Sequence, residues 1–314
     1  MNNLKIFKFA LAAHEKGESP FLVIVADHTG SSPGKQGFKM VVSSSDGSYG
    51  TIGGGKVEYD IISQIKEGKF DEASEPVLIH SVHDPKDNLN SGMICSGSQS
   101  QIIIKLTPEY LEKIKSIISV IETGQKVILE ISKERIAIYE GTKQTESFSF
   151  LNQDDWLYRE VINNLDKVFI VGAGHVGSKL AEVMRFLDFY TVLIDNRAGL
   201  ESLKNNQFAD EKIITDYPEI NKIVEDYSYA VILTHNHEYD LDVLRELLKR
   251  NLKYLGMIGS KEKVNSTFLA LLKEGIDEKE LKKVKAPIGI SINSITAEEI
   301  AISIAAEIIK VKNG

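Results

Sequence analysis

Residues 167–197 read KVFIVGAGHVGSKLAEVMRFLDFYTVLIDNR, and this stretch decides the fold of the second half of the chain. The apolar run Val168–Val171 predicts a buried β-strand, which a glycine-rich turn and a segment with helical periodicity follow. A second apolar strand, Tyr190–Ile194, ends at Asp195. A strand, a G-x-G-x-x-G turn, a helix and a second strand ending in an acid form the βαβ fingerprint of dinucleotide-binding folds.

The three glycines of this turn have separate roles in such a fold. Gly172 permits the tight turn, Gly174 lets the backbone approach a pyrophosphate, and Gly177 lets the helix pack close to the strand. The helix N-terminus adds free N–H groups and a partial positive charge for the phosphates. His175 is either a donor to a phosphate or a solvated loop residue. The alternative is a fold that keeps its glycines for packing and binds no nucleotide.

The acid at the end of the second strand predicts how a ribose is recognised. Asp195 would accept hydrogen bonds from the 2′- and 3′-hydroxyls and would repel a 2′-phosphate, which favours NAD over NADP. Arg197 keeps NADP open as the cofactor, because a guanidinium can pair with that phosphate.

Length and charge limit the classes of protein to consider. The 314 residues suit two domains of ordinary size. The net charge of -8 argues against nucleic acid or an anionic membrane as the main partner. The start, MNNLKIFKFALAAHEKG, lacks a signal peptide's apolar core, and no run is long enough to span a bilayer, so we expect a cytoplasmic protein. Cys95 is the only cysteine, which excludes an intrachain disulfide.

The order of predicted elements indicates an α/β protein of two domains. Strands and polar loops up to about residue 151 predict an α+β domain. The polar stretch Asn152–Asp166 precedes the first strand of the glycine fingerprint and contains the expected boundary. We therefore expect an N-terminal α+β domain at residues 1–155 and a Rossmann-like domain with a doubly wound parallel sheet at residues 156–314.

Glycine-rich loops in the first half predict a possible anion site. DHTGSSPGKQG (27–37) and Gly53-Gly54-Gly55 each adjoin a predicted strand or helix start. Backbone N–H groups, hydroxyls and one ammonium would bind the anion there, and the candidates are Ser31, Ser32, Lys35, Gly53, Gly54, Gly55 and, in the first helical turn, Glu58. The alternative is a pair of β-turns with solvated side chains. Cys95 lies in a third predicted loop of this kind. Its side chain is either a small buried apolar group, a reactive thiol or a soft ligand.

Three further loops should lie at the carboxyl ends of the parallel strands, where ligands bind in such sheets. They are Thr234–Asp240, Gly259–Lys263 and Pro287–Asn293. Thr234 and His235 are candidate contacts to a cofactor. His235, His237 and Asp240 have side chains of the metal-ligand type, although a helix cap and first turn explain them equally well.

Several motifs together resemble one protein family. In the first half they are GSSPGKQGFKM, YGTIGGGKVE and MICSG, and in the second half VFIVGAGHVG, LIDNR, LTHNHEYD, MIGSKEK and APIGISINSITAEEIAISIAAEI. The chain resembles the XdhC/CoxI family of xanthine dehydrogenase accessory factors over nearly its full length. The family usually has Cys-Gly-Gly where this chain has Cys95-Ser96-Gly97.

The resemblance implies an accessory role rather than catalysis. Such a protein would bind the molybdenum cofactor, protect it while its terminal sulfur is installed, and pass it to the apo-enzyme of a molybdenum hydroxylase. A cofactor-sulfurating enzyme would be a second partner. The candidate anion site would then hold the pterin phosphate, with Lys35 neutralising charge and Cys95 near molybdenum or its sulfur, since a thiolate is a soft ligand.

Two other functions stay open at this point. One is an NAD(P)-dependent oxidoreductase, and the other is a binding protein that a nucleotide regulates. The last helix, predicted at Ala297–Val311, has isoleucines on more than one face. It predicts either the interface of a homodimer or packing within a single protomer.

Overall fold

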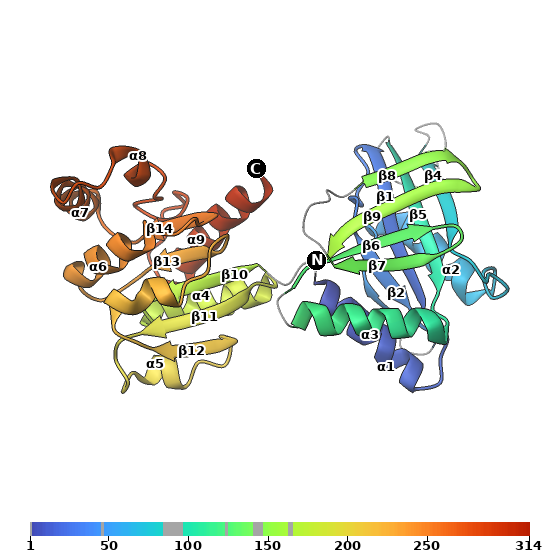
Figure 1. Cartoon of the computed structure of the whole chain (residues 1–314), viewed down its shortest axis with the longest axis horizontal. Coiled ribbons are helices and arrows are strands. Elements are labelled where there is room, and N and C mark those ends of the chain that lie inside the picture. The colour runs from blue at the N-terminus through green and yellow to red at the C-terminus, as the bar shows by residue number, and fades with distance from the viewer. Residues whose placement is uncertain (1, 45–46, 84–96, 123–124, 141–146, 163–165) are drawn as a thin grey trace. The chain divides into compact units, whose positions relative to one another are not determined.

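Antiparallel sheets build the first half of the chain and a parallel sheet builds the second half (Figure 1). The structure, a computed structural model, describes residues 2–44, 47–83, 97–122, 125–140, 147–162 and 166–314. The chain divides into two compact units, Met1–Asn164 and Leu165–Gly314. This arrangement of elements confirms the predicted fold class.

The first unit combines two antiparallel sheets with three helices that the structure describes. The strand order is β3-β2-β1-β5-β4 in one sheet and β7-β6-β9-β8 in the other. Its elements are α1 (Asn3–Glu15), β1 (Phe21–Gly30), β2 (Lys39–Val42), β3 (Ser48–Gly50), α2 (Gly55–Lys66), β4 (Val77–His83), β5 (Gly97–Lys105), α3 (Pro108–Glu122), β6 (Val127–Ser132), β7 (Ile136–Glu140), β8 (Ser147–Asn152) and β9 (Asp155–Ile162).

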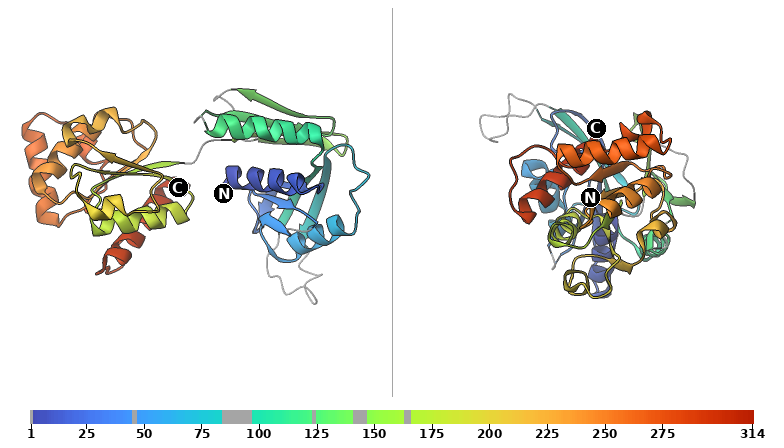
Figure 2. Two further views of the ribbon diagram at one scale, coloured as in Figure 1. Left: turned by 90° about the horizontal axis from the view of Figure 1, so that it is seen from below. Right: turned by 90° about the vertical axis from the view of Figure 1, so that its left-hand side faces the viewer.

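Both faces of the first sheet are covered. One face packs with α1, α3 and the second sheet around residues such as Leu22, Ile104 and Trp156. The other face packs against α2, whose Ile61 and Ile65 repeat at helical spacing and are buried. Figure 2 shows α1 and α3 lying together in this unit.

A buried ion pair joins the two sheets of the first unit. The Lys39 Nζ of β2 lies 2.5 Å from the Glu160 Oε1 of β9, and the two side chains are 0% and 5% exposed. Lys39 also donates to the Gly37 carbonyl (2.9 Å), and the Tyr158 hydroxyl donates to Glu160 Oε2 (2.9 Å). The pair therefore fixes the end of the loop that precedes β2.

The first unit extends further along the chain than the expected first domain. Strand β9, at Asp155–Ile162, occupies the polar stretch expected to contain the boundary. It pairs with β6 and β8, so it belongs to the second sheet, and the first unit ends at Asn164, which lies within the expected stretch Asn152–Asp166 but beyond residue 155. The polar sequence is compatible with a strand because only alternate residues, among them Trp156 and Tyr158, are buried.

The second unit is a parallel sheet in the order β12-β11-β10-β13-β14. The order reverses between β10 and β13, as in dinucleotide-binding folds. Its elements are β10 (Lys167–Val171), α4 (His175–Phe186), β11 (Tyr190–Asp195), α5 (Glu201–Lys204), β12 (Glu211–Ile214), the 3-10 helix η2 (Tyr217–Lys222), β13 (Tyr229–Ile232), α6 (His237–Leu247), β14 (Tyr254–Met257), α7 (Lys261–Lys273), α8 (Glu278–Leu281) and α9 (Ala297–Asn313).

Helices cover both faces of this sheet. Helices α6 and α7 and the segment η2 pack on one face, around residues such as Val171 and Ile232. Helices α4 and α9 pack on the other, around Ile170 and Val231. A capping box between Thr296 and Glu299 starts α9.

The isoleucines of α9 divide between the core and the surface. Ile304 and Ile308 are buried within the second unit, whereas Ile302 is 53% exposed. Much of this helix's apolar character therefore serves packing inside the unit. None of the helices that the structure describes has the length and apolar character needed to cross a membrane.

Candidate functional site

The glycine turn of the second unit is tightly packed at two positions and open at the third. A Cβ on Gly172, whose φ is +113°, would lie 2.2 Å from the Leu233 carbonyl oxygen, and one on Gly177 would lie 1.9 Å from the Gly172 oxygen. A Cβ on Gly174 would have nothing within 4 Å. Gly174 is also the N-cap of α4, and no side chain caps this helix. The turn therefore offers open space and N–H groups, and His175 is exposed beside it.

Asp195 lies at the carboxyl end of β11 and is completely buried. Its Oδ2 accepts from the Ala173 N–H (2.8 Å) and from Arg197 Nη2 (2.9 Å). Its Oδ1 accepts from the Arg197 N–H (3.0 Å) and from Arg197 Nε (2.8 Å). Burial alone would raise the pKa of Asp195, but the hydrogen bonds from Arg197 and Ala173 outweigh it and hold the pKa below its usual range.

Two buried polar atoms lie near this acid. The Tyr217 hydroxyl and Asn196 Oδ1 have no hydrogen-bond partner among the residues that the structure describes. Burial raises the pKa of Tyr217, and the charge of Asp195 raises it further. No sequence motif pointed to Tyr217, because it belongs to a 3-10 segment after the short strand β12.

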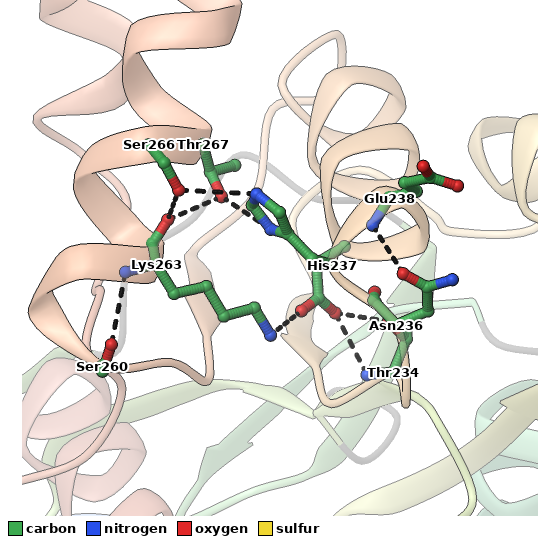
Figure 3. Close-up of polar contacts among 9 residues, drawn as sticks. Thr234, Asn236, His237, Glu238, Ser260, Lys263, Ser266 and Thr267 are labelled. Atoms are coloured by element: carbon green, nitrogen blue, oxygen red, sulfur yellow. Dashed lines mark hydrogen bonds and ion pairs between the residues drawn. The ribbon is translucent and has the colours of Figure 1, made fainter.

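A second ion pair lies where β13 and β14 lead into their helices. Asp240 is completely buried on α6, and Lys263 of α7 pairs with it. Asp240 Oδ1 also accepts from the Thr234 hydroxyl (2.6 Å) and the Thr234 N–H (3.2 Å). Figure 3 shows Lys263 extending toward the Thr234 loop. The sequence placed Lys263 at the end of a candidate ligand loop, but it did not predict the pairing of Lys263 with Asp240.

The histidines of the same region are exposed. His237 opens α6, and its ring nitrogens lie 3.4 Å from the hydroxyls of Ser266 and Thr267 (Figure 3). His235 packs its ring against Tyr239. No group of three or more His, Cys, Asp or Glu side chains in the described part of the chain is arranged to hold a metal ion. In the described residues, His235, His237 and Asp240 do not form a metal-ligand group, and Asp240 is instead buried and paired with Lys263.

Three loops of the first unit meet at one place. A Cβ on Gly53 would lie 2.4 Å from the Gly34 nitrogen, and one on Gly34 would lie 2.0 Å from the Ile52 oxygen. A Cβ on Gly97 would lie 3.1 Å from the Ser32 nitrogen. Gln99 links these loops, because its Nε2 donates to the Ile52 carbonyl (2.7 Å). Backbone this close explains why glycines stand at these positions.

Glu58 lies in the first turn of α2, and its carboxylate folds back onto the preceding loop at residues 51–54. Its Oε2 accepts from the Thr51 hydroxyl (2.6 Å), the Ile52 N–H (2.9 Å) and the Gly54 N–H (3.0 Å). The chain's own carboxylate thus accepts from the Gly54 N–H, one of the groups that were expected to bind an anion. A Cβ on Gly54 would still have nothing within 4 Å, and α2 has no side-chain cap.

The other predicted residues of the first unit lie around this meeting point. Ser32 is buried, 3% exposed, whereas Ser31, Lys35 and Gly55 are exposed. Cys95, the predicted molybdenum contact, lies outside the residues that the structure describes. The structure therefore brings Ser31, Ser32, Gly53 and Gly54 together, and it holds the Rossmann residues in a separate unit.

These features define a two-unit protein that carries a Rossmann domain and a separate glycine-loop site. Residues 168–308 match the XdhC Rossmann domain, and residues 13–73 match the XdhC and CoxI family. The chain belongs to the XdhC and CoxI family.

Individual relatives agree with this assignment. The chain is 23% identical to a probable subunit of xanthine dehydrogenase from Bacillus subtilis, over 95% of this chain and 94% of that protein. It is 30% identical to the uncharacterized protein YqeB of Escherichia coli over 47% of this chain, a match that spans only 27% of the length of YqeB. A crystal structure of a xanthine dehydrogenase from Bacillus halodurans matches with a TM-score of 0.78 at 22% identity, over 99% of this chain and 96% of that one, which supports the fold.

Proposed function

We propose that this chain is an accessory protein of a xanthine dehydrogenase-type hydroxylase and that it binds the molybdenum cofactor and passes it to the apo-enzyme. Membership of the XdhC and CoxI family supports the accessory role. The observation that carries the finer proposal is the meeting of three loops, around Gly34, Gly53 and Gly97, in the first unit. A cofactor-sulfurating enzyme would be the second partner, and the chain would act as a homodimer.

The residues of the glycine-loop site fit the anionic end of such a cofactor. The Ser31 hydroxyl and the Lys35 ammonium are exposed there, and the N-terminus of α2 at Gly55 has no side-chain cap. These groups would bind and orient a phosphate. The bound cofactor brings the redox chemistry of the enzyme that receives it, and this chain would hold and shield it. Cys95 would supply a soft sulfur contact.

Binding of the cofactor tests this proposal. The purified full chain is titrated with molybdenum cofactor under anaerobic conditions, as wild type, Cys95→Ala and Lys35→Ala. Gly174→Ala is the matched control, because it alters only the second unit and its Cβ has free space. We expect binding to weaken in both first-unit variants and to persist in Gly174→Ala. A wild type that binds a dinucleotide but no molybdenum cofactor would refute the carrier role.

We propose in addition that the second unit binds a dinucleotide. The uncapped N-terminus of α4 and the open position at Gly174 support this site. A methyl group at Gly174 keeps the fold but occupies the space of a pyrophosphate. Gly174→Ala should therefore lose dinucleotide binding, measured by calorimetry, without losing thermal stability. Unchanged binding in that variant would exclude the glycine turn as the phosphate site.

A further inference from the structure

The acid that ends β11 has no capacity left for a ribose. Each carboxylate oxygen offers two lone pairs, and each Asp195 oxygen already accepts two hydrogen bonds. The side chain is 0% exposed. A ribose diol would have to displace Arg197 from a buried carboxylate, and separating a buried charge pair is costly.

Arg197, in contrast, retains unused donors. Its Nε and Nη2 bind Asp195, but Nη1 has no hydrogen-bond partner among the described residues. The side chain is 37% exposed, so the guanidinium can reach a ligand. The hydrogen bonds of Arg197 to Asp195, through both backbone and side chain, hold it at the end of β11.

The position of this guanidinium relates it to the phosphate site. Asp195 Oδ2 accepts from Arg197 and from Ala173, and Ala173 lies between the first two glycines of the turn. A single carboxylate oxygen thus separates the guanidinium from the glycine turn. In this fold the end of the second strand faces the adenosine ribose, and a nearby arginine accommodates a 2′-phosphate.

The charge exposed at this position is therefore positive. Arg197 neutralises the carboxylate that would otherwise repel a phosphate, and its free edge matches phosphate geometry. We propose that Arg197 is the specificity-determining residue of the second unit and that it selects a dinucleotide with a 2′-phosphate, of the NADP type, over one with a free ribose diol. This inference rests on the proposed dinucleotide binding.

Binding constants of NADPH and NADH for the purified full chain test the proposal. One charge-assisted contact corresponds to about a 10- to 100-fold preference for NADPH. ADP and 2′,5′-ADP are measured beside them, because this pair isolates the effect of a 2′-phosphate from that of the nicotinamide half. The preference should fall as ionic strength rises, since an exposed ion pair is screened.

Variants test whether Arg197 causes the preference for NADPH over NADH. Arg197→Ala should lose it, and so should the double variant Asp195→Asn/Arg197→Ala, which leaves no unpaired buried carboxylate. Arg185→Ala is the matched control, because Arg185 forms the ion pair with Asp210, whose Oδ2 accepts from the N–H of Thr191 at the start of the same strand. This control should keep the preference.

The outcomes separate the two proposals. Equal or tighter binding of NADH by the wild type overturns the inference but leaves dinucleotide binding intact. A preference that survives in both Arg197 variants also overturns it. A wild type that binds none of the four nucleotides refutes dinucleotide binding itself, and with it the role of Arg197.

Discussion

Replacing Lys39 by methionine should destabilise the first unit strongly. Lys39 and Glu160 are 0% and 5% exposed, so the substitution leaves a buried carboxylate that, among the described residues, keeps the hydrogen bond from the Tyr158 hydroxyl but loses its cation. Breaking a buried pair on one side typically costs about 3–5 kcal/mol. With a urea m-value of about 2 kcal/mol/M, the unfolding midpoint should fall by roughly 1.5–2.5 M.

The chain contains its own probe for this measurement. Trp156 is the only tryptophan, and it lies buried on β9, the strand that carries Glu160. Tryptophan fluorescence in urea therefore reports unfolding of the first unit alone. Lys39→Met/Glu160→Gln removes both charges and should recover at least about 1 kcal/mol of the single variant's loss, by the logic of a double-mutant cycle.

An exposed ion pair in the same unit is the matched control. Lys8 and Glu122 pair at 2.6 Å with side chains 54% and 49% exposed, so Lys8→Met should cost at most about 1 kcal/mol. If Lys39→Met shifts the midpoint no further than Lys8→Met does, the buried pair does not join the two sheets as inferred. A double variant no more stable than Lys39→Met would contradict the reasoning as well.

Three shorter predictions concern the second unit. Lys263→Met leaves Asp240 buried without its cation, which should cost about 3 kcal/mol of unfolding free energy. The melting temperature should therefore fall by roughly 6–12 °C. Lys261 is exposed, so the control Lys261→Met should leave the melting temperature nearly unchanged. Because the pKa of Asp195 is lowered in the folded state, its contribution to stability is present above about pH 4 and is lost as pH falls through the folded pKa, so Asp195→Asn should flatten the acid limb of stability against pH. Burial and the hydrogen bond to Glu211 raise the pKa of Tyr190 to about 12, so it should ionise later than free tyrosine in an absorbance titration, and stability should fall as pH rises above about 10; ionisation near pH 10 would contradict this.

The second unit was predictable because local chemistry dictates its shape. The glycine turn after Val168–Val171 and the acid at Asp195 specify a βαβ unit from nearby residues alone. The hydrogen-bond partners of Asp195 were not predictable from the sequence. Nothing local indicates that Arg197 and Ala173 fill both carboxylate oxygens, because this depends on how the turn and the strand end meet.

Strand β9 was missed for a related reason. Its inward positions are Trp156, Tyr158, Glu160 and Ile162, and the glutamate interrupts the apolar alternation that predicts a strand. Glu160 is compatible with the core only because Lys39, far away in sequence, neutralises it. A pattern read along one segment cannot contain a partner 121 residues away.

Under the proposed function, the carboxylate of Glu58 would make ligand binding at the glycine loop an exchange of hydrogen-bond acceptors, because Glu58 already accepts from the loop. The Thr51, Ile52 and Gly54 donors are satisfied before any ligand arrives, so the loop is preorganised when empty. A phosphate oxygen that replaced the Glu58 carboxylate at these donors would gain only the difference between its own hydrogen-bond free energy and that of Glu58. As such a ligand left, Glu58 would form its hydrogen bonds with the three donors again, which would lower the free-energy barrier to release. The proposed carrier role requires a site of moderate affinity that empties readily, and under that proposal Glu58 would act as an internal competitor for the ligand.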